Sequence, residues 1–295
     1  DIVRKHKLTS KSISDDEVLD IYDMLSDIIS FKISNDPKNL SRLKKYQDNV
    51  DKLLTATITV DCNFVENTLG PKLVEATNAS DGEIVETDYE SLAPVEEQYS
   101  EEALNLAKKI FQLSITGKCT SSDIALEAAK IMFTAQRDFA IAKFIAGREQ
   151  VNNNYESALE YYDGAIESTD DDLQKSEVYL NKAQLYAVIG NKIKSRQNAR
   201  KSLTLNPSFK DAYKLIGNLY MSSYDDCREG KSRVKDRLVF IAAYKMFKRA
   251  GLDSKANQAR EQFPSMEELF NENLEVGELM NTGCWVNEDV TLNKR

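Results

Sequence analysis

Apolar residues along most of this chain recur at intervals of three and four, the spacing that one face of an α-helix produces. Two such stretches, residues 15–31 and 40–54, are separated by a break at Pro37. Because proline disrupts a helix that would run through it, the two stretches are expected to be separate helices. We therefore predict an amino-terminal helical hairpin within a segment that covers residues 1–76.

Residues 77–100 lack this periodicity and are rich in acidic and turn-forming residues. Such a composition is typical of a solvated loop or linker. Helical spacing resumes in residues 101–138, where Gly117 divides it into two stretches. Because glycine is common just past the end of a helix, residues 101–138 are predicted to form a repeat-like helix pair.

Beyond residue 138 the sequence repeats itself. An aromatic residue, a small residue and a tyrosine recur 34 residues apart, as Tyr179, Ala183 and Tyr186 and again as Tyr213, Gly217 and Tyr220. An upstream copy begins near Ala142, and the downstream copy is interrupted by an insertion near residues 222–236. We predict an array of about three helix-pair units in residues 139–263.

This pattern resembles the tetratricopeptide repeat, a helix pair with a period of 34 residues. The resemblance implies an all-α fold in which the pairs stack into a right-handed α-solenoid. Residues 264–295 depart from the helical pattern and hold the only tryptophan, Trp285. We predict a short extended tail there, which either caps the open end of the solenoid or presents Trp285 to a partner.

Charge is distributed unevenly along the chain. The net charge of −9 argues against nucleic acid as the main ligand. Residues 171–260 nevertheless hold 19 Lys and Arg against 9 Asp and Glu. A basic run there consists of Lys192, Lys194, Arg196, Arg200 and Lys201. It is either a solvated face or a docking site for an acidic partner. No apolar run reaches the roughly 18 residues that a membrane span needs.

The residue types present do not indicate catalysis, a cofactor or a metal site. The single histidine, His6, excludes histidine-based triads and histidine-rich metal centres. The cysteines lack the paired spacing of zinc fingers and thioredoxin-like proteins. Adjacent carboxylates such as Glu96 and Glu97 lie in polar stretches and are better explained as solvated faces. An enzyme that uses carboxylates alone is therefore the least favoured of three functional hypotheses.

The resemblance also implies where a partner binds, because the first helix of each tetratricopeptide repeat lines the concave surface. The candidate partner-binding residues are Lys143, Gln150, Glu177, Leu180, Asn181, Gln184, Asp211, Lys214, Asn218 and Met221. Some arrays of this family clamp a terminal carboxylate with Lys, Asn and Arg side chains. Lys143 and Asn181 match that clamp, whereas Gly147, Asp211 and Leu215 depart from it. The candidate groove is mixed in charge, and a clamp of that type is not expected.

The carboxy-terminal residues narrow the resemblance to a group of Bacteroides-type cell-envelope tetratricopeptide proteins. The shared features are the loop with Cys227, the segment Phe263-Pro264-Ser265 with Glu267 and Phe270, then Gly277, Gly283 and Trp285-Val286-Asn287-Glu288. This likeness implies export to the periplasm or cell envelope, with a signal peptide that is not part of this sequence. A cytoplasmic location is the alternative.

Export would change the expected state of the four cysteines, since disulfides persist in oxidising compartments. The pairs suggested are Cys62–Cys119 and Cys227–Cys284, each of which closes a loop of roughly 57 residues. The sequence alone leaves three connectivities open. Four buried free thiols are the alternative.

The leading functional hypothesis is a non-enzymatic scaffold or adaptor that binds another protein or peptide through the concave face. The alternative is a periplasmic chaperone-like holdase for unfolded or exported chains. Neither hypothesis requires a cofactor.

Overall fold

The computed structural model describes residues 61–80 and 99–295, together with Ile21, Met24, Leu25, Ile28, Lys45, Tyr46 and Asn49. Most of the predicted amino-terminal hairpin and most of the predicted acidic linker lie outside the described residues. The chain divides into two compact units, residues 1–131 and 132–295.

The described part of the first unit is helical. It contains α4 (Cys62–Phe64), the π-helical turn η2 (Val65–Leu69), α5 (Gly70–Ser80), α6 (Glu101–Thr116) and most of α7 (Asp123–Ala135). The hydroxyl of Ser100 accepts a hydrogen bond from the backbone N–H of Ala103 at 3.1 Å, which caps the start of α6. The buried apolar side chains include Val65, Leu69, Leu73, Ile110 and Ile131.

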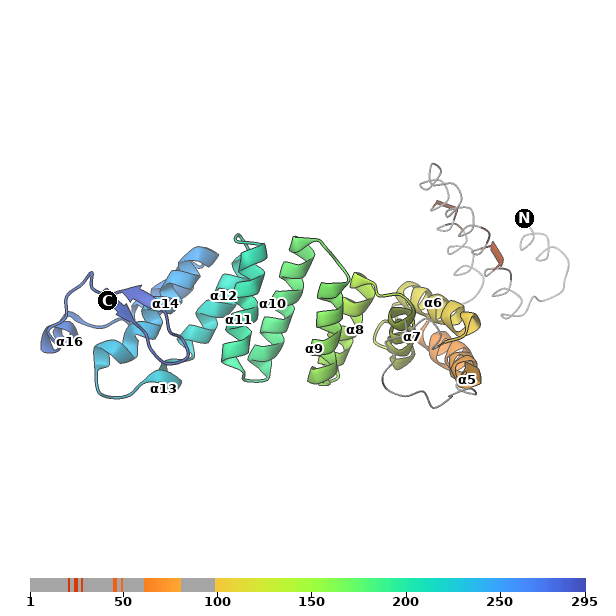
Figure 1. Cartoon of the computed structure of the whole chain (residues 1–295), viewed down its shortest axis with the longest axis horizontal. Coiled ribbons are helices and arrows are strands. Elements are labelled where there is room, and N and C mark those ends of the chain that lie inside the picture. The colour runs from red at the N-terminus through yellow and green to blue at the C-terminus, as the bar shows by residue number, and fades with distance from the viewer. Residues whose placement is uncertain are drawn as a thin grey trace, which may run out of the picture. The chain divides into compact units, whose positions relative to one another are not determined.

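Helix pairs make up most of the second unit, and they pack side by side in chain order (Figure 1). The pairs are α8 (Phe139–Val151) with α9 (Tyr155–Glu167), α10 (Asp172–Val188) with α11 (Lys192–Leu205), and α12 (Lys210–Met221) with α14 (Arg233–Ala250). We call α8, α10 and α12 the first helices and α9, α11 and α14 the second helices. The predicted insertion holds the short α13 (Tyr224–Cys227). After α14 come α15 (Asp253–Arg260) and α16 (Met266–Asn271).

Small residues let the two helices of a pair approach closely. Gly217 on α12 lies so near the ring of Phe247 on α14 that an added β-carbon would be 2.6 Å from Cε1 of that ring. The hydroxyl of Ser195 on α11 donates a hydrogen bond to the carbonyl oxygen of Ala183 on α10 at 2.7 Å. These are the positions at which the repeat pattern places small residues, because a larger side chain would force the helices apart.

The carboxy-terminal tail forms a hairpin of two short antiparallel strands, β1 (Leu279–Asn281) and β2 (Asp289–Thr291), with Met280 opposite Val290. Val286, Val290 and Leu292 are buried in the same apolar cluster as Phe247 of α14. The tail therefore extends the core of the last helix pair. The expected all-α, tetratricopeptide-type fold is confirmed. Residues 264–295 were expected to be extended, but they begin with helix α16, and only their end forms this hairpin.

Candidate functional site

All ten predicted partner-binding residues lie on the first helices α8, α10 and α12. One contact joins the successive first helices α8 and α10, and another joins α12 to α15. Lys143 Nζ on α8 donates to Glu177 Oε2 on α10 at 2.7 Å, and Lys255 Nζ on α15 donates to Asn218 Oδ1 on α12 at 2.7 Å. We define the first-helix surface as Lys143, Gln150, Glu177, Asn181, Gln184, Asp211, Lys214, Asn218 and Met221.

The predicted residues differ in their availability to a ligand. Leu180 is only 4% exposed, because α10 is packed between α9, α11 and α12, so its side chain does not line a binding surface. Gln150 accepts a hydrogen bond from the Tyr162 hydroxyl at 3.1 Å, and Met221 packs against the core of the last helix pair. The exposed members of the first-helix surface are Glu177, Gln184, Asp211 and Lys214.

The basic run on the second helix α11 is engaged by other parts of the same chain. Lys192 Nζ donates to Asp226 Oδ2 of the insertion at 2.6 Å and to the carbonyl oxygen of Ser222 at 2.8 Å. Arg196 donates to the carbonyl oxygen of Val286, and Arg200 forms an ion pair with Glu288. Lys192, Arg196 and Arg200 follow each other at intervals of four, so they lie on one face of α11.

The remaining two lysines of the run stack on aromatic rings. Lys194 Nζ lies 5.4 Å from the ring centroid of Tyr186, and Lys201 Nζ lies 5.4 Å from that of Tyr179. Both are cation–π contacts across the α10–α11 pair. The simpler expectation for this run is a solvated face without specific contacts. Each of its five residues instead contacts another part of the same chain. Lys192, Arg196 and Arg200 hold the insertion and the tail against α11.

Trp285 lies in a half-buried position between the tail and the helices. Its ring centroid is 5.9 Å from that of Tyr220, and the guanidinium of Arg196 lies over it at 5.4 Å. Its Nε1 is buried without a hydrogen-bond partner among the described residues. The indole ring of Trp285 is therefore engaged by residues of the same chain, and a capping role for the tail stays a prediction.

Glu288 ties the tail to two helices. Besides its ion pair with Arg200 of α11, it accepts a hydrogen bond from the hydroxyl of Tyr220 of α12 at 2.5 Å. Burial and the hydrogen bond to the Glu288 carboxylate together raise the pKa of Tyr220 to about 12. The phenol therefore stays protonated and remains a donor at every physiological pH.

Each cysteine lies beside one other cysteine. Cys62 and Cys119 form a disulfide in the first unit, with 5.0 Å between their Cα atoms. Cys227 of the insertion and Cys284 of the tail form a disulfide in the second unit, with 5.5 Å between their Cα atoms. The second bond fastens the tail hairpin to the insertion that follows α12, next to the contacts made by Lys192 and Arg196.

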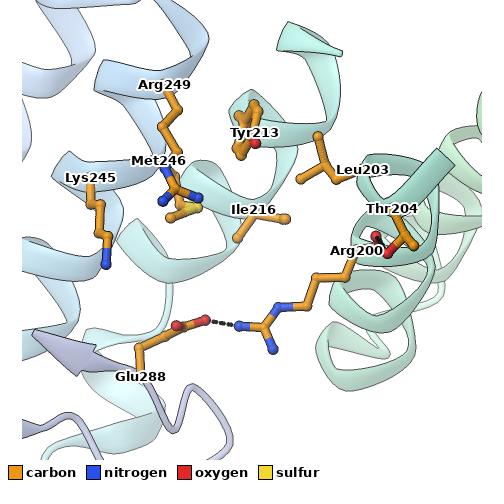
Figure 2. Close-up of a pocket in the computed structure, with 9 residues that line it drawn as sticks. All are labelled: Arg200, Leu203, Thr204, Tyr213, Ile216, Lys245, Met246, Arg249 and Glu288. Atoms are coloured by element: carbon orange, nitrogen blue, oxygen red, sulfur yellow. Dashed lines mark hydrogen bonds and ion pairs between the residues drawn. The ribbon is translucent and has the colours of Figure 1, made fainter. Parts of the chain in front are cut away.

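A cavity of about 480 Å³ lies between α11, α12 and α14 in the second unit (Figure 2). Its lining residues are Arg200, Leu203, Thr204, Tyr213, Ile216, Lys245, Met246, Arg249 and Glu288. Lys245 and Arg249 are not among the residues predicted from the sequence to bind a partner. The available signal was their spacing of four residues on one helix, which places both cations on the same face of α14.

The described residues hold no cluster of three or more metal-ligating side chains. Within the same residues, no helix combines the length and the apolar character that crossing a bilayer requires.

Comparison with solved structures returns distant likenesses. MamA shares 13% identity over 69% of this chain and 98% of that chain, with a TM-score of 0.39. PilF of Pseudomonas aeruginosa shares 15% identity over 88% of this chain and 98% of that chain, with a TM-score of 0.34. A tetratricopeptide repeat protein from Parabacteroides merdae shares 13% identity over 72% of this chain and 80% of that chain, with a TM-score of 0.32. No protein-family model and no curated protein matches the sequence. The fold assignment rests on the helix pairs themselves.

Proposed function

We propose that this protein is a non-enzymatic scaffold or adaptor that binds a polypeptide partner through the first-helix surface. One observation carries the proposal. The insertion attaches to α11, and the tail attaches to α11 and to the buried Tyr220 of α12, whereas Glu177, Gln184, Asp211 and Lys214 on the first helices stay exposed. A stack of helices that leaves one series of polar faces open is the arrangement with which helical-repeat proteins bind extended partners.

The charges on this surface alternate, and this bears on the kind of partner. Lys143 is paired with Glu177, and Asp211 lies one helical turn from Lys214. Neither sign dominates, so strong electrostatic steering of a highly charged ligand is not expected. A partner segment of mixed polarity fits these side chains better than a bare terminal carboxylate, for which the required Asn, Lys and Arg positions hold Gly147, Asp211 and Leu215.

The cysteine pairs support a second part of the proposal, that the protein works in the periplasm or cell envelope. Both pairs have the Cα separation of a disulfide, and structural disulfides persist in oxidising compartments. The likeness of the tail to cell-envelope tetratricopeptide proteins points the same way. A cytoplasmic adaptor with four reduced thiols is the alternative.

A holdase for unfolded or exported chains is the second candidate function. It is favoured by exposed apolar side chains near the carboxy-terminal end, where Phe270 is 81% exposed and Leu279 is 72% exposed. Such side chains suit promiscuous contact with unfolded polypeptides. The adaptor remains the leading proposal, because it accounts for an ordered polar surface that spans three helix pairs.

The test compares two charge reversals at exposed lysines. Lys214→Glu changes the first-helix surface, and Lys235→Glu makes the same change on the second helix α14. Affinity capture with the wild-type protein should recover a defined stoichiometric complex that Lys214→Glu weakens and Lys235→Glu leaves intact. Equal effects of the two variants would contradict the assignment of the surface. Suppression of the aggregation of unrelated unfolded proteins, with no defined complex, would establish the holdase instead.

A further inference from the structure

We propose that the basic cavity between α11, α12 and α14 binds an acidic side chain of a partner polypeptide together with a neighbouring apolar side chain. The cavity has a volume of about 480 Å³, within the range of ligand-binding cavities. Figure 2 shows Lys245, Met246 and Arg249 on the α14 side, and Arg200, Leu203 and Thr204 on the α11 side. Ile216 and Tyr213 of α12 lie between them.

The charge of the lining calls for an anion. Arg200, Lys245 and Arg249 contribute three positive charges and Glu288 one negative charge, a net charge of +2. Glu288 is already engaged by Arg200 and by the Tyr220 hydroxyl. Within residues 99–295, no carboxylate forms an ion pair with Lys245 or Arg249. Like charges one helical turn apart repel each other, so a carboxylate placed between these two cations would relieve that repulsion.

The apolar part of the lining argues against a simple inorganic anion. Leu203, Ile216 and Met246 line the cavity together with the ring of Tyr213. The guanidinium of Arg249 lies 5.6 Å from the centroid of that ring, a cation–π contact that orients it at the cavity. A fully hydrated anion would leave the apolar side chains in contact with water. A ligand with an acidic group beside an aliphatic or aromatic group would cover these apolar side chains and, at the same time, place its acidic group against the cations.

The contacts of the tail with α11 illustrate how a polypeptide segment can bind beside the cavity. Trp285 and Glu288 are three residues apart, and they contact Arg196 and Arg200, which are four residues apart on α11. An aromatic residue and an acidic residue of one short segment are thus held by successive cations of one helix. Arg200 and Glu288 form one wall of the cavity, so a partner segment bound there would continue the same pattern towards α14.

This inference goes beyond the proposed function, because the cavity is lined largely by second helices and includes no residue of the first-helix surface. Failure at one site therefore leaves the other intact. The variants that test the cavity are Lys245→Ala with Arg249→Ala, and the single change Lys245→Gln, which leaves the Arg249–Tyr213 contact in place. Lys235→Ala removes an exposed cation from the same helix outside the cavity and is the matched control.

The probe is a fluorescein-labelled peptide, blocked at both ends, that carries two Glu-Leu pairs in a Gly-Ser background. Fluorescence anisotropy measures its binding to the full chain. We expect saturable binding that Lys245→Ala with Arg249→Ala weakens about tenfold, while Lys235→Ala changes it by less than about twofold. Carbodiimide should cross-link the peptide carboxylate to Lys245 Nζ, which mass spectrometry would locate. Lys245→Gln should abolish that cross-link in a protein whose Trp285 fluorescence is unchanged.

Two comparison peptides and one ion decide what is recognised. If the cavity recognises both the acidic and the apolar side chain, a peptide with Gln in place of Glu and a peptide with Ser in place of Leu should both bind more weakly. Equal binding of the Gln peptide, or equal loss in the Lys235→Ala control, would overturn the proposal. Displacement of the peptide by millimolar inorganic phosphate would overturn it in favour of a general anion site.

Discussion

The hydroxyl of Tyr220 on α12 donates a hydrogen bond to the carboxylate of Glu288 in the tail, with 2.5 Å between the two oxygens. The residues are 68 positions apart in the sequence. Glu288 also pairs with Arg200, so one carboxylate joins α11, α12 and the tail. The disulfide between Cys227 and Cys284 also links the tail to the insertion that follows α12.

The Tyr220–Glu288 contact predicts a pH dependence of stability at high pH. A tyrosine in the unfolded chain ionises near pH 10, and Tyr220 in the folded protein ionises at about 12. Because the folded state binds this proton more tightly, its stabilising contribution is complete below pH 10 and is lost as the pH rises from 10 to 12. Tyr220→Phe should lower the free energy of unfolding by about 1–2 kcal/mol at neutral pH. Urea denaturation at a series of pH values should show the difference from wild type shrinking in that window. A difference that stays constant up to pH 12 would contradict the assignment.

The tail contacts predict a fluorescence change, because Trp285 is the only tryptophan in the sequence. Arg196→Ala removes the guanidinium over the indole ring and the donor to the Val286 carbonyl oxygen. The ring should become more exposed to water, with emission shifted to longer wavelength and a loss of about 1–2 kcal/mol of stability. Lys194→Ala, on the same helix, removes a stacked cation from Tyr186 and is the control. Its emission spectrum should match that of the wild type.

Both disulfides predict a protein without free thiols. Thiol titration of the denatured protein, purified without reductant, should find none. Four titratable thiols would show that the pairs are not oxidised, and would favour the cytoplasmic alternative. Each bond closes a loop of 57 residues, for which the chain-entropy model gives about 4 kcal/mol.

Replacement of one cysteine pair at a time distinguishes the effects of the two disulfides. Cys227→Ser with Cys284→Ser should destabilise the second unit and shift the Trp285 emission, because the tail loses its covalent attachment. Cys62→Ser with Cys119→Ser opens a loop of equal length in the first unit. That double variant should leave the Trp285 emission unchanged, and an equal shift in both variants would contradict the proposed role of the Cys227–Cys284 bond.

Two helical glycines predict opposite responses to the same substitution. An added β-carbon at Gly217 would meet Cε1 and Cδ1 of Phe247 at 2.6 and 2.7 Å, so Gly217→Ala should destabilise the protein by about 1–3 kcal/mol. At Gly147 on α8 an added β-carbon meets nothing within 4 Å. Gly147→Ala should therefore stabilise the protein by up to about 1 kcal/mol, through helix propensity alone. Thermal unfolding of both variants measures the difference, and a stable Gly217→Ala would show that α12 and α14 approach less closely than described.

The repeat period and the helical spacing were sufficient to predict the fold class. Helix pairs place small residues at fixed offsets, and such local rules can be read along a chain without its tertiary structure. Gly217 illustrates this, because its place in the 34-residue pattern already implied a close helix contact. Leu180 shows the limit of the same reasoning. Its offset suggested the concave face, but three neighbouring helices bury it.

Local patterns were enough to predict the helix pairs of the array, the place of the insertion and the positions that must be small, but not helix α16 in the segment expected to be extended. The fold was needed to establish what the basic run of α11 contacts, which cysteines lie together and that Lys245 and Arg249 share a cavity with Arg200. The reason is physical. Helix formation depends on residues three and four apart, whereas Arg200 meets Glu288 across 88 residues of sequence, and no local pattern encodes which of many charged residues will be brought within reach.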